Sequence, residues 1–461
     1  MEEKIYTLLT GLRRYALDKG YEVSLFYQEE DSCLMRFANS AISLNTNEHL
    51  IRLRVTAYAG RKRASVGLIT DLAKIDEMNA GIDTAAAMAE HAMPLTYTPT
   101  IPVFSTSFSD ASVFDPALAG VRNDEKLAYI NEAVQGMETD DIRLSGIFSS
   151  GTNTTALINT RSEHTLYFKT SDAQISAVLS HTALKWEISA EQSARARSDL
   201  HASSLKHDLA FLLKHYRNDS PQQLPIGSYD IVFGSAAVAD LLTCLGWIAY
   251  SGGAFKRGFS CMTEEMIGKK IFSDKIDIID DPDQCDTFPC RVDMTGISRK
   301  PFPLFTQGVF RGFLWSQDDA DEFGAKPTGH TVPRTSIILH GGEKDVDSLA
   351  ALAALPRDKD ILYIPCLHYM NVVNPSKAII TGSSRFGALL LKQDGSVAIP
   401  YNVRLTQSLL DIFGDNVAWL SATTAVRNTS NSYGPRNPTA IIVPQFMCVN
   451  NLGISHSNPS Y

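Results

Sequence analysis

The sequence lacks a hydrophobic run long enough to cross a membrane, and it has few cysteines. Its most apolar window, Ala236–Tyr250, is shorter than a membrane span and contains the charged residue Asp240. The opening residues show no basic segment followed by an apolar stretch, so we expect no signal peptide. The seven cysteines follow no disulfide or zinc-ligand spacing, which indicates reduced thiols. We therefore expect a cytoplasmic protein that has no membrane partner.

The motifs of nucleotide and nucleic-acid chemistry are also absent from the sequence. The chain carries a formal net charge of -9, and its one dense basic cluster, Arg61–Arg63, is short. Binding to a phosphate backbone needs a concentrated basic surface, so we expect no nucleic-acid partner. The sequence contains no GxGxxG, GxxxxGK[ST] or GxSxG motif. These absences remove the usual signatures of dinucleotide binding, of a P-loop and of an α/β-hydrolase nucleophile.

Hydrophobic periodicity predicts an α+β fold in which an N-terminal helix and antiparallel sheet precede a strand-rich C-terminal domain. A helix is expected from about Glu2 to Lys19, because apolar residues recur at helical spacing and a glycine follows. The segments His49–Tyr58 and Ala64–Ile69 alternate apolar and polar side chains on either side of a turn, which predicts a hairpin. The predicted parts are an N-terminal α+β unit (1–93), a proline-rich connector (94–111), a middle α+β unit (112–220) and a β-rich C-terminal domain (221–461).

Two further segments of the chain have clear predicted structures. In the middle unit, we expect a meander of four short strands and then one long helix over about Ala190–Arg217. In the C-terminal domain, we expect an unusually apolar helix over about Ser235–Tyr250 and a shorter helix over Leu405–Phe413.

The histidines are poorly placed for a zinc-hydrolase helix. Such a helix needs two imidazoles about one turn apart and a carboxylate that deprotonates the metal-bound water. The sequence contains no histidine between His215 and His330, so the apolar helix has none. Only the tertiary structure decides whether four later residues converge on a metal; these are His330, His340, Cys366 and His368.

Four stretches, taken together in this order and spacing, resemble a known family. They are MRFAN (35–39) with IRLRV (51–55), LGWIAYSGGAFKR (245–257), FGAKPTGH (323–330) and GSSRFGA (382–388) with DGSVAIP (394–400). In the second stretch, a serine-glycine-glycine follows the apolar helix. This set is similar to the TldD/PmbA family, whose members were once called modulators of DNA gyrase. The resemblance extends over nearly the whole chain.

The resemblance implies that the zinc site of the TldD branch is missing from this chain. In that branch the apolar helix carries HExxxH, and a cysteine near the C-terminus completes the site. The best match places Thr243, Cys244 and Ile248 at the positions of the first histidine, the glutamate and the second histidine. None of the three supplies an imidazole or a carboxylate. The segment Val426–Pro438, where the family cysteine would fall, has no cysteine, and Cys448 lies beyond it.

The implied function is therefore that of a PmbA/TldE-like subunit of a TldD/TldE-type metallopeptidase that acts on unfolded or precursor peptides. This chain is expected to be non-catalytic alone, with no cofactor of its own and zinc only in a TldD-like partner that carries HExxxH. Two alternatives remain open. One is a stand-alone metallopeptidase with an unrecognised metal site, and the other is a non-catalytic peptide-binding homodimer.

Six residues are candidates for a peptide groove or a subunit interface: Gly252, Gly253, Lys256, Arg257, Gly329 and His330. Glycines permit a close approach of another backbone, and a basic side chain can hold a peptide carboxylate. An extended peptide can also add to the edge of a sheet in a strand-rich domain. The structural alternative is equally open: the glycines end a helix, the basic residues are exposed, and the histidine is buried and hydrogen-bonded.

Overall fold

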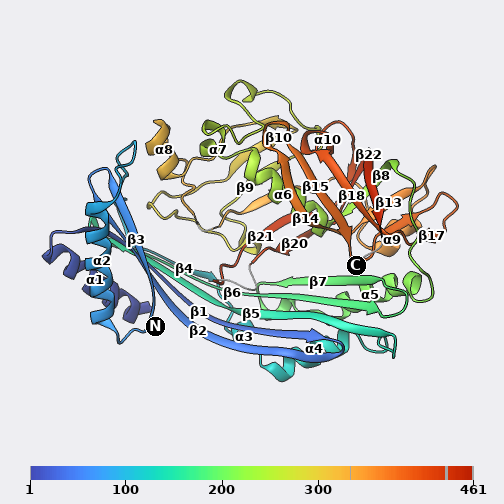
Figure 1. The fold of residues 1–461 in the computed structure, drawn as a ribbon, viewed down its shortest axis with the longest axis horizontal. Helices are drawn as coiled ribbons and strands as arrows, with labels where there is room; N and C mark the ends of the chain where they lie inside the picture. The colour runs from blue at the N-terminus through green and yellow to red at the C-terminus, as the bar shows by residue number, and fades with distance from the viewer. Residues whose placement is uncertain (1, 333, 431–434, 459–461) are drawn as a thin grey trace.

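The computed structural model describes residues 2–332, 334–430 and 435–458 and has the mixed α+β fold that the sequence predicts (Figure 1). A long curved sheet forms the N-terminal half, and the C-terminal domain lies on one face of it. The helices are α1 (Glu2–Asp18), α2 (Ile75–His91), α3 (Pro116–Ala119), α4 (Asn123–Ala133), α5 (Ala202–Tyr216), α6 (Ser235–Ile248), α7 (Gly252–Lys256), α8 (Gln317–Phe323), α9 (Leu349–Ala354) and α10 (Leu409–Ile412). No helix in the described residues combines the length and the apolar content that a membrane crossing needs.

The curved sheet has seven strands, and four of them are very long. The order is β3 (Lys62–Thr70), β2 (Ala41–Ala59), β1 (Glu22–Ala38), β5 (Ile142–Asn159), β6 (Ser162–His181) and β4 (Phe108–Val113). The seventh strand, β7 (Glu187–Ala194), also pairs with β6, so β4 and β7 share one edge of that strand. Strands from residues 1–93 and from residues 112–220 thus join in a single sheet through the pairing of β1 with β5.

The alternation of side chains along β1 gives the curved sheet two different faces. Val23, Leu25 and Tyr27 are buried on the outer face in one core with residues of α1 and α2, and Met35 and Phe37 are buried in another core with residues of α3 and α4. Because successive side chains of a strand point to opposite faces, the even-numbered residues of β1 point toward the C-terminal domain. The curved sheet therefore packs against helices on its outer face and against the C-terminal domain on its inner face.

The C-terminal domain contains two further sheets with α6 between them. The six-stranded sheet has the order β11 (Val309–Phe310), β10 (Phe302–Thr306), β9 (Ile278–Asp280), β12 (Ile337–Leu339), β21 (Ala440–Pro444) and β20 (Thr424–Asn428). The nine-stranded sheet has the order β14 (Cys366–Asn374), β15 (Ile379–Arg385), β18 (Asn402–Ser408), β22 (Phe446–Asn458), β8 (Gly227–Gly234), β13 (Ile361–Ile364), β16 (Leu389–Leu391) and β17 (Val397–Ala398), and β19 (Val417–Leu420) pairs with β22. Helix α6 packs against β14 and β8 of one sheet and against β20 and β21 of the other.

Several predicted elements differ from the structure, and the differences share one cause. The helix expected at 190–217 is wrong over its first part, because residues up to Ala194 form β7 and α5 begins only at Ala202. The four short strands expected at 142–180 are the two continuous strands β5 and β6. The helix expected at 405–413 is wrong over its first four residues, which belong to strand β18, and only α10 is helical there. In each place a partner strand supplies backbone hydrogen bonds that local composition does not reveal.

The C-terminal domain is fixed to the curved sheet by a buried arginine. Arg436, between β20 and β21, donates from Nε to Asp172 Oδ1 at 2.7 Å and from Nη1 to Ser149 Oγ at 3.0 Å. Its backbone amide donates to Glu30 Oε2 at 2.9 Å, and Asn153 donates to its carbonyl oxygen. The Arg436 and Asp172 side chains are 5% and 0% exposed. This contact joins strands β1, β5 and β6 to the domain above them.

Replacement of Arg436 is expected to loosen the two halves of the chain. Arg436→Met leaves the Asp172 carboxylate buried without its cation, so the free energy of unfolding should fall by about 3–5 kcal/mol in urea denaturation. The double variant Arg436→Met/Asp172→Leu should be more stable than the single one, since it also removes the stranded charge. Arg14→Met, on the exposed side of α1, should stay within about 0.5 kcal/mol of the parent chain. Equal losses for the three variants would contradict the role of the buried pair.

Candidate active-site helix and the interdomain seam

Helix α6 occupies the place where the resemblance puts a zinc site. Its sequence is rich in alanine and leucine, and most of its side chains are buried, which explains why a helix forms between two sheets. At the three motif positions, Thr243 donates its hydroxyl to the carbonyl of Ala239 at 2.8 Å, and Cys244 and Ile248 are buried in the hydrophobic core. Burial raises the pKa of Cys244 to about 11, which disfavours the thiolate that a metal would need. These three residues therefore do not fit a zinc ion.

A buried carboxyl, Asp240, lies one turn before Cys244 on the same helix. Its Oδ2 accepts a hydrogen bond from the backbone amide of Leu367 on β14 at 3.2 Å. Burial raises the pKa of Asp240 to about 7, and the negative charge of Glu191 on β7 adds to this shift, while Arg427 opposes it. Asp240 is therefore able to exchange a proton near neutral pH.

Polar residues continue from Asp240 along the seam between α6 and the curved sheet. Arg427, on β20, donates to Ser235 Oγ from Nε at 3.0 Å and from Nη2 at 2.6 Å, and its Nη1 lies 3.7 Å from Glu191 Oε2. Cys366, on β14, donates to the carbonyl of Arg385 at 3.2 Å. Burial raises the pKa of the Cys366 thiol, so this cysteine is a poor nucleophile.

A cavity of about 360 Å³ opens at one end of this seam. Arg385 lines this cavity and donates to Glu187 Oε2 at 3.1 Å. The cavity is lined by residues of β7, β14, β15, β18 and β22, among them Glu187, His368, Ser383, Arg385 and Arg404. Burial lowers the pKa of His368, and the positive charge of Arg385 lowers it further, so the imidazole is held neutral. The seam thus contains acidic, basic and imidazole groups from both halves of the chain.

The predicted glycines lie where neighbouring side chains leave no room for a Cβ. Gly252 and Gly253 begin α7 and are buried; a Cβ on Gly252 would overlap the Trp315 ring, and one on Gly253 would overlap the Asp319 carboxylate. Trp315, just before α8, and Asp319, within α8, occupy this space. Whether the same glycines also line a peptide groove stays a prediction.

The predicted basic residues are engaged in ion pairs at the surface. Lys256 Nζ lies 2.7 Å from Glu264 Oε1, and Arg257 Nη1 lies 2.9 Å from Asp319 Oδ1 and also pairs with Glu322. A peptide carboxylate would have to displace these partners. Exposed pairs of this kind contribute little to stability.

Gly329 and His330 follow Thr328, whose amide donates to the carbonyl of Trp315, the residue that packs on Gly252. Gly329 has φ +80, a conformation that favours glycine, and it packs on Ile297 and Arg299. His330 Nε2 lies 2.7 Å from Asp280 Oδ2, and its Nδ1 lies 2.8 Å from Thr328 Oγ1. Burial opposes ionisation of Asp280, yet His330 and Arg299 hold the pKa of that carboxyl below its usual range.

The four residues left open as a metal set do not form a three-ligand group in the residues that the structure describes. One group does bring three potential ligand atoms within 4.8 Å of one another, and it consists of Glu29, Asp31 and His49 on the curved sheet. Sequence reasoning missed this group because its members become neighbours only through the pairing of β1 with β2. Residues 431–434, in the segment where the family cysteine would fall, lie outside the described residues.

The pKa of Asp240 predicts an unusual pH dependence of stability. The folded chain holds this proton more tightly than the unfolded chain, whose aspartates titrate near 4, so stability should fall as pH rises from about 4 to about 7. Asp240→Asn keeps an acceptor for Leu367, and at pH 8 it should exceed the parent chain by about 1–3 kcal/mol in urea denaturation. The difference should vanish below about pH 4. Asp140→Asn, at an exposed site, serves as the control, and parallel curves for all three chains would refute the assignment.

The family model of the PmbA/TldA metallopeptidase C-terminal domain matches residues 226–456, half of the chain. No curated protein matches the sequence of this chain significantly. The chain is similar in structure to TldE from Thermococcus kodakarensis, with 15% sequence identity, a TM-score of 0.79 and coverage of 97% of this chain and 100% of that one.

Two further solved structures are candidate modulators of DNA gyrase. The one from Thermotoga maritima has 14% identity, a TM-score of 0.73 and coverage of 97% of this chain and 99% of its own, and the one from Bacteroides thetaiotaomicron has 15% identity, a TM-score of 0.75 and coverage of 98% of both chains. At these identities the structural likeness shows the fold. With the family model covering α6 and both sheets around it, the chain belongs to the TldD/PmbA family of metallopeptidase-related proteins.

Proposed function

We propose that this chain is a TldE-like subunit that binds peptides beside a separate, zinc-bearing TldD-like chain. The observation that carries the proposal is the chemistry of α6. At the motif positions it offers a hydroxyl that is bonded to its own helix, a buried thiol and an aliphatic side chain. No member of this set can hold a zinc-bound water or accept a proton from it. Cleavage in such a system has to come from the partner.

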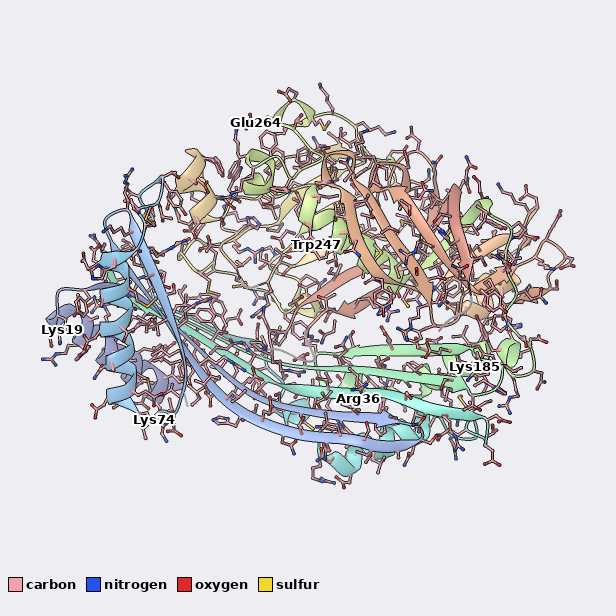
Figure 2. All side chains as sticks on the ribbon, in the orientation of Figure 1. Lys19, Arg36, Lys74, Lys185, Trp247 and Glu264 are labelled. Carbon is pink, nitrogen blue, oxygen red and sulfur yellow. The ribbon has the colours of Figure 1, made fainter. Side chains whose placement is uncertain are left out.

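The likeness to TldE over 97% of this chain supports the same proposal at the level of the fold. A surface suited to a partner or a peptide is also present on α6, where the ring of Trp247 (Figure 2) is 58% exposed. Tryptophan is enriched at protein interfaces because a large apolar ring carries one polar N–H group.

A second cavity offers a place for the peptide itself. It has a volume of about 420 Å³ and lies between β1–β3 of the curved sheet and the loops around α8. Its lining combines apolar rings such as Phe26 and Phe104 with the cation of Arg54. Within the described residues Arg54 has no ion-pair partner, and its guanidinium lies 4.7 Å from the centre of the Phe26 ring. A planar guanidinium held in this way is suited to a peptide carboxylate.

The heterodimer is tested by mixing the full chain with a TldD-like chain that carries HExxxH. Neither chain alone should degrade a small unfolded peptide at the rate of the mixture, and the two should elute together in size-exclusion chromatography. Replacing the partner's motif glutamate by glutamine should abolish cleavage, because that glutamate activates the zinc-bound water. Cleavage by this chain alone would instead favour a stand-alone peptidase, and binding of peptide without any complex would favour a peptide-binding homodimer.

The role of Arg54 is tested in the same mixture with matched peptides. Arg54→Gln should raise KM roughly tenfold for a peptide with a free C-terminal carboxylate, since a charge-assisted hydrogen bond contributes about 1.5–3 kcal/mol. The C-terminally amidated peptide should show no change. Arg14→Gln, on the exposed side of α1, is the control variant. Equal effects on both peptides would show that Arg54 does not read the carboxylate.

A further inference from the structure

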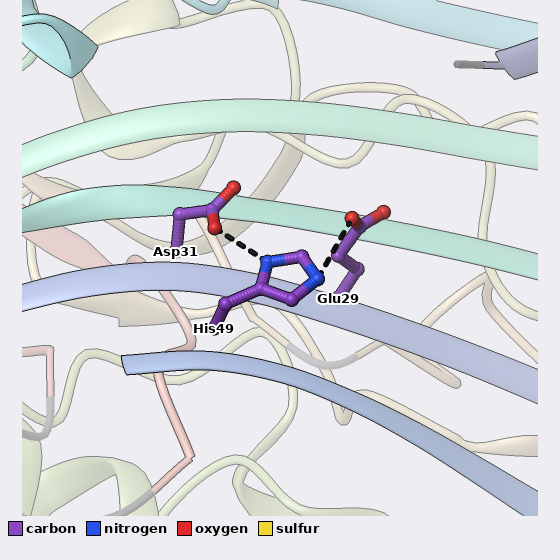
Figure 3. Close-up of side chains that lie close together, drawn as sticks. All are labelled: Glu29, Asp31 and His49. Carbon is purple, nitrogen blue, oxygen red and sulfur yellow. Dashed lines mark hydrogen bonds and ion pairs between the residues drawn. The ribbon is translucent and has the colours of Figure 1, made fainter. Parts of the chain in front are cut away.

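Three side chains that could bind a metal ion, those of Glu29, Asp31 and His49, lie close together on strands β1 and β2 of the curved sheet (Figure 3). Glu29 and Asp31 are two residues apart on β1, so they point to the same side of the sheet. His49 stands directly opposite Asp31 on β2. Along β1, the cluster lies between the part buried by α1 and α2 and the part buried by α3 and α4.

The two nitrogens of His49 face different carboxylates. Nδ1 lies 2.5 Å from Asp31 Oδ1, which is a short hydrogen bond. Nε2 lies 3.7 Å from Glu29 Oε1, which is too far for a hydrogen bond. The hydrogen bond with Asp31 and the negative charges of Asp31 and Glu29 raise the pKa of His49, so a metal ion at Nε2 has to displace a proton from that nitrogen.

The Glu29 side chain is fixed in position by burial and by one hydrogen bond, as the side chain of a metal ligand usually is. It is only 6% exposed, and its Oε2 accepts a hydrogen bond from the Tyr27 hydroxyl at 2.9 Å. Its Oε1 is left facing His49 without a hydrogen-bond donor among the described residues. This oxygen is therefore the atom of Glu29 that is available to a cation.

The distance between His49 Nε2 and Glu29 Oε1 matches the distance between two ligands of one metal ion. Bonds of about 2.0–2.2 Å at a tetrahedral or slightly wider angle place two ligand atoms about 3.3–3.7 Å apart. Asp31 then has the position of the carboxylate that orients a metal-bound histidine from its other nitrogen. A cavity of about 460 Å³ adjoins Asp31 and His49 and leaves room for water ligands.

From this arrangement we propose a divalent transition-metal site in which His49 Nε2 and Glu29 Oε1 are the protein ligands and Asp31 holds the imidazole. Water from the adjoining cavity completes the coordination. One nitrogen and one carboxylate oxygen favour Zn²⁺ over Mg²⁺ or Ca²⁺, which prefer oxygen ligands alone. The site links β1 to β2 on the outer face, so it is independent of α6 and of the proposed heterodimer.

The test is a calorimetric titration of the full chain with ZnCl₂ in mildly alkaline buffer, because protons compete with the metal ion for His49. One equivalent should bind, and MgCl₂ at the same concentration should not compete. His49→Gln and Glu29→Gln should each weaken binding at least tenfold, and Asp31→Asn should weaken it roughly tenfold, as loss of an orienting partner does. His91→Gln, an exposed histidine at the end of α2, should bind as the parent chain does.

A second readout separates loss of the site from loss of the fold. Zn²⁺ should raise the thermal unfolding temperature of the parent chain, because a ligand of the native state stabilises it, and this rise should be absent in Glu29→Gln. Circular dichroism in the absence of metal should be the same for both chains. The proposal is overturned if no stoichiometric Zn²⁺ binds, or if His49→Gln retains the parent affinity. Peptide cleavage by the heterodimer plays no part in either outcome.

Discussion

The contact of Arg436 with Asp172 is the constraint on which the arrangement of this molecule depends. It places one arginine of the C-terminal domain against three long strands of the curved sheet, where Arg436 donates hydrogen bonds to Glu30, Asp172 and Ser149. Asp172 also accepts a hydrogen bond from Asn428 on β20 at 2.8 Å. A buried charge pair stabilises a fold only when such partners are in place, so the pair specifies how the two halves meet. The seam under α6 and the cavity beside Arg54 exist because the halves are held in this position.

The seam lies beside the helix that carries the family's motif positions. Helix α6 retains its buried place between two sheets, while its motif positions are filled by residues that pack or bond locally. The charged groups nearby come from both halves of the chain: Glu187 and Glu191 from the curved sheet, and Arg385 and Arg427 from the C-terminal domain. Their pairing makes the seam a contact surface between domains. The proposal of a catalytic partner depends instead on the residues at the motif positions of α6.

The two faces of the curved sheet carry the two proposed binding sites. Its inner face supplies Arg54, which has no ion-pair partner in the part of the chain that the structure describes, to a cavity, and its outer face supplies Glu29 and His49 to the proposed metal site. Both faces are set by the same alternation along β1 and β2, since a shift of one residue would exchange them. The length of these strands allows one sheet to carry a binding surface on one side and a cation site on the other.

The sequence by itself determined the features that depend on local pattern or on residue chemistry alone. The helix α1, the hairpin of β2 and β3 and the apolar helix α6 follow from short-range periodicity, and the lack of an imidazole pair on α6 needs no coordinates. Tertiary structure decided the rest: β7 is a strand because it pairs with β6, Asp172 meets an arginine 264 residues away, and Asp31 meets His49 through strand register. Local propensity cannot fix these, because each depends on which distant segment supplies the hydrogen bonds and the opposite charge.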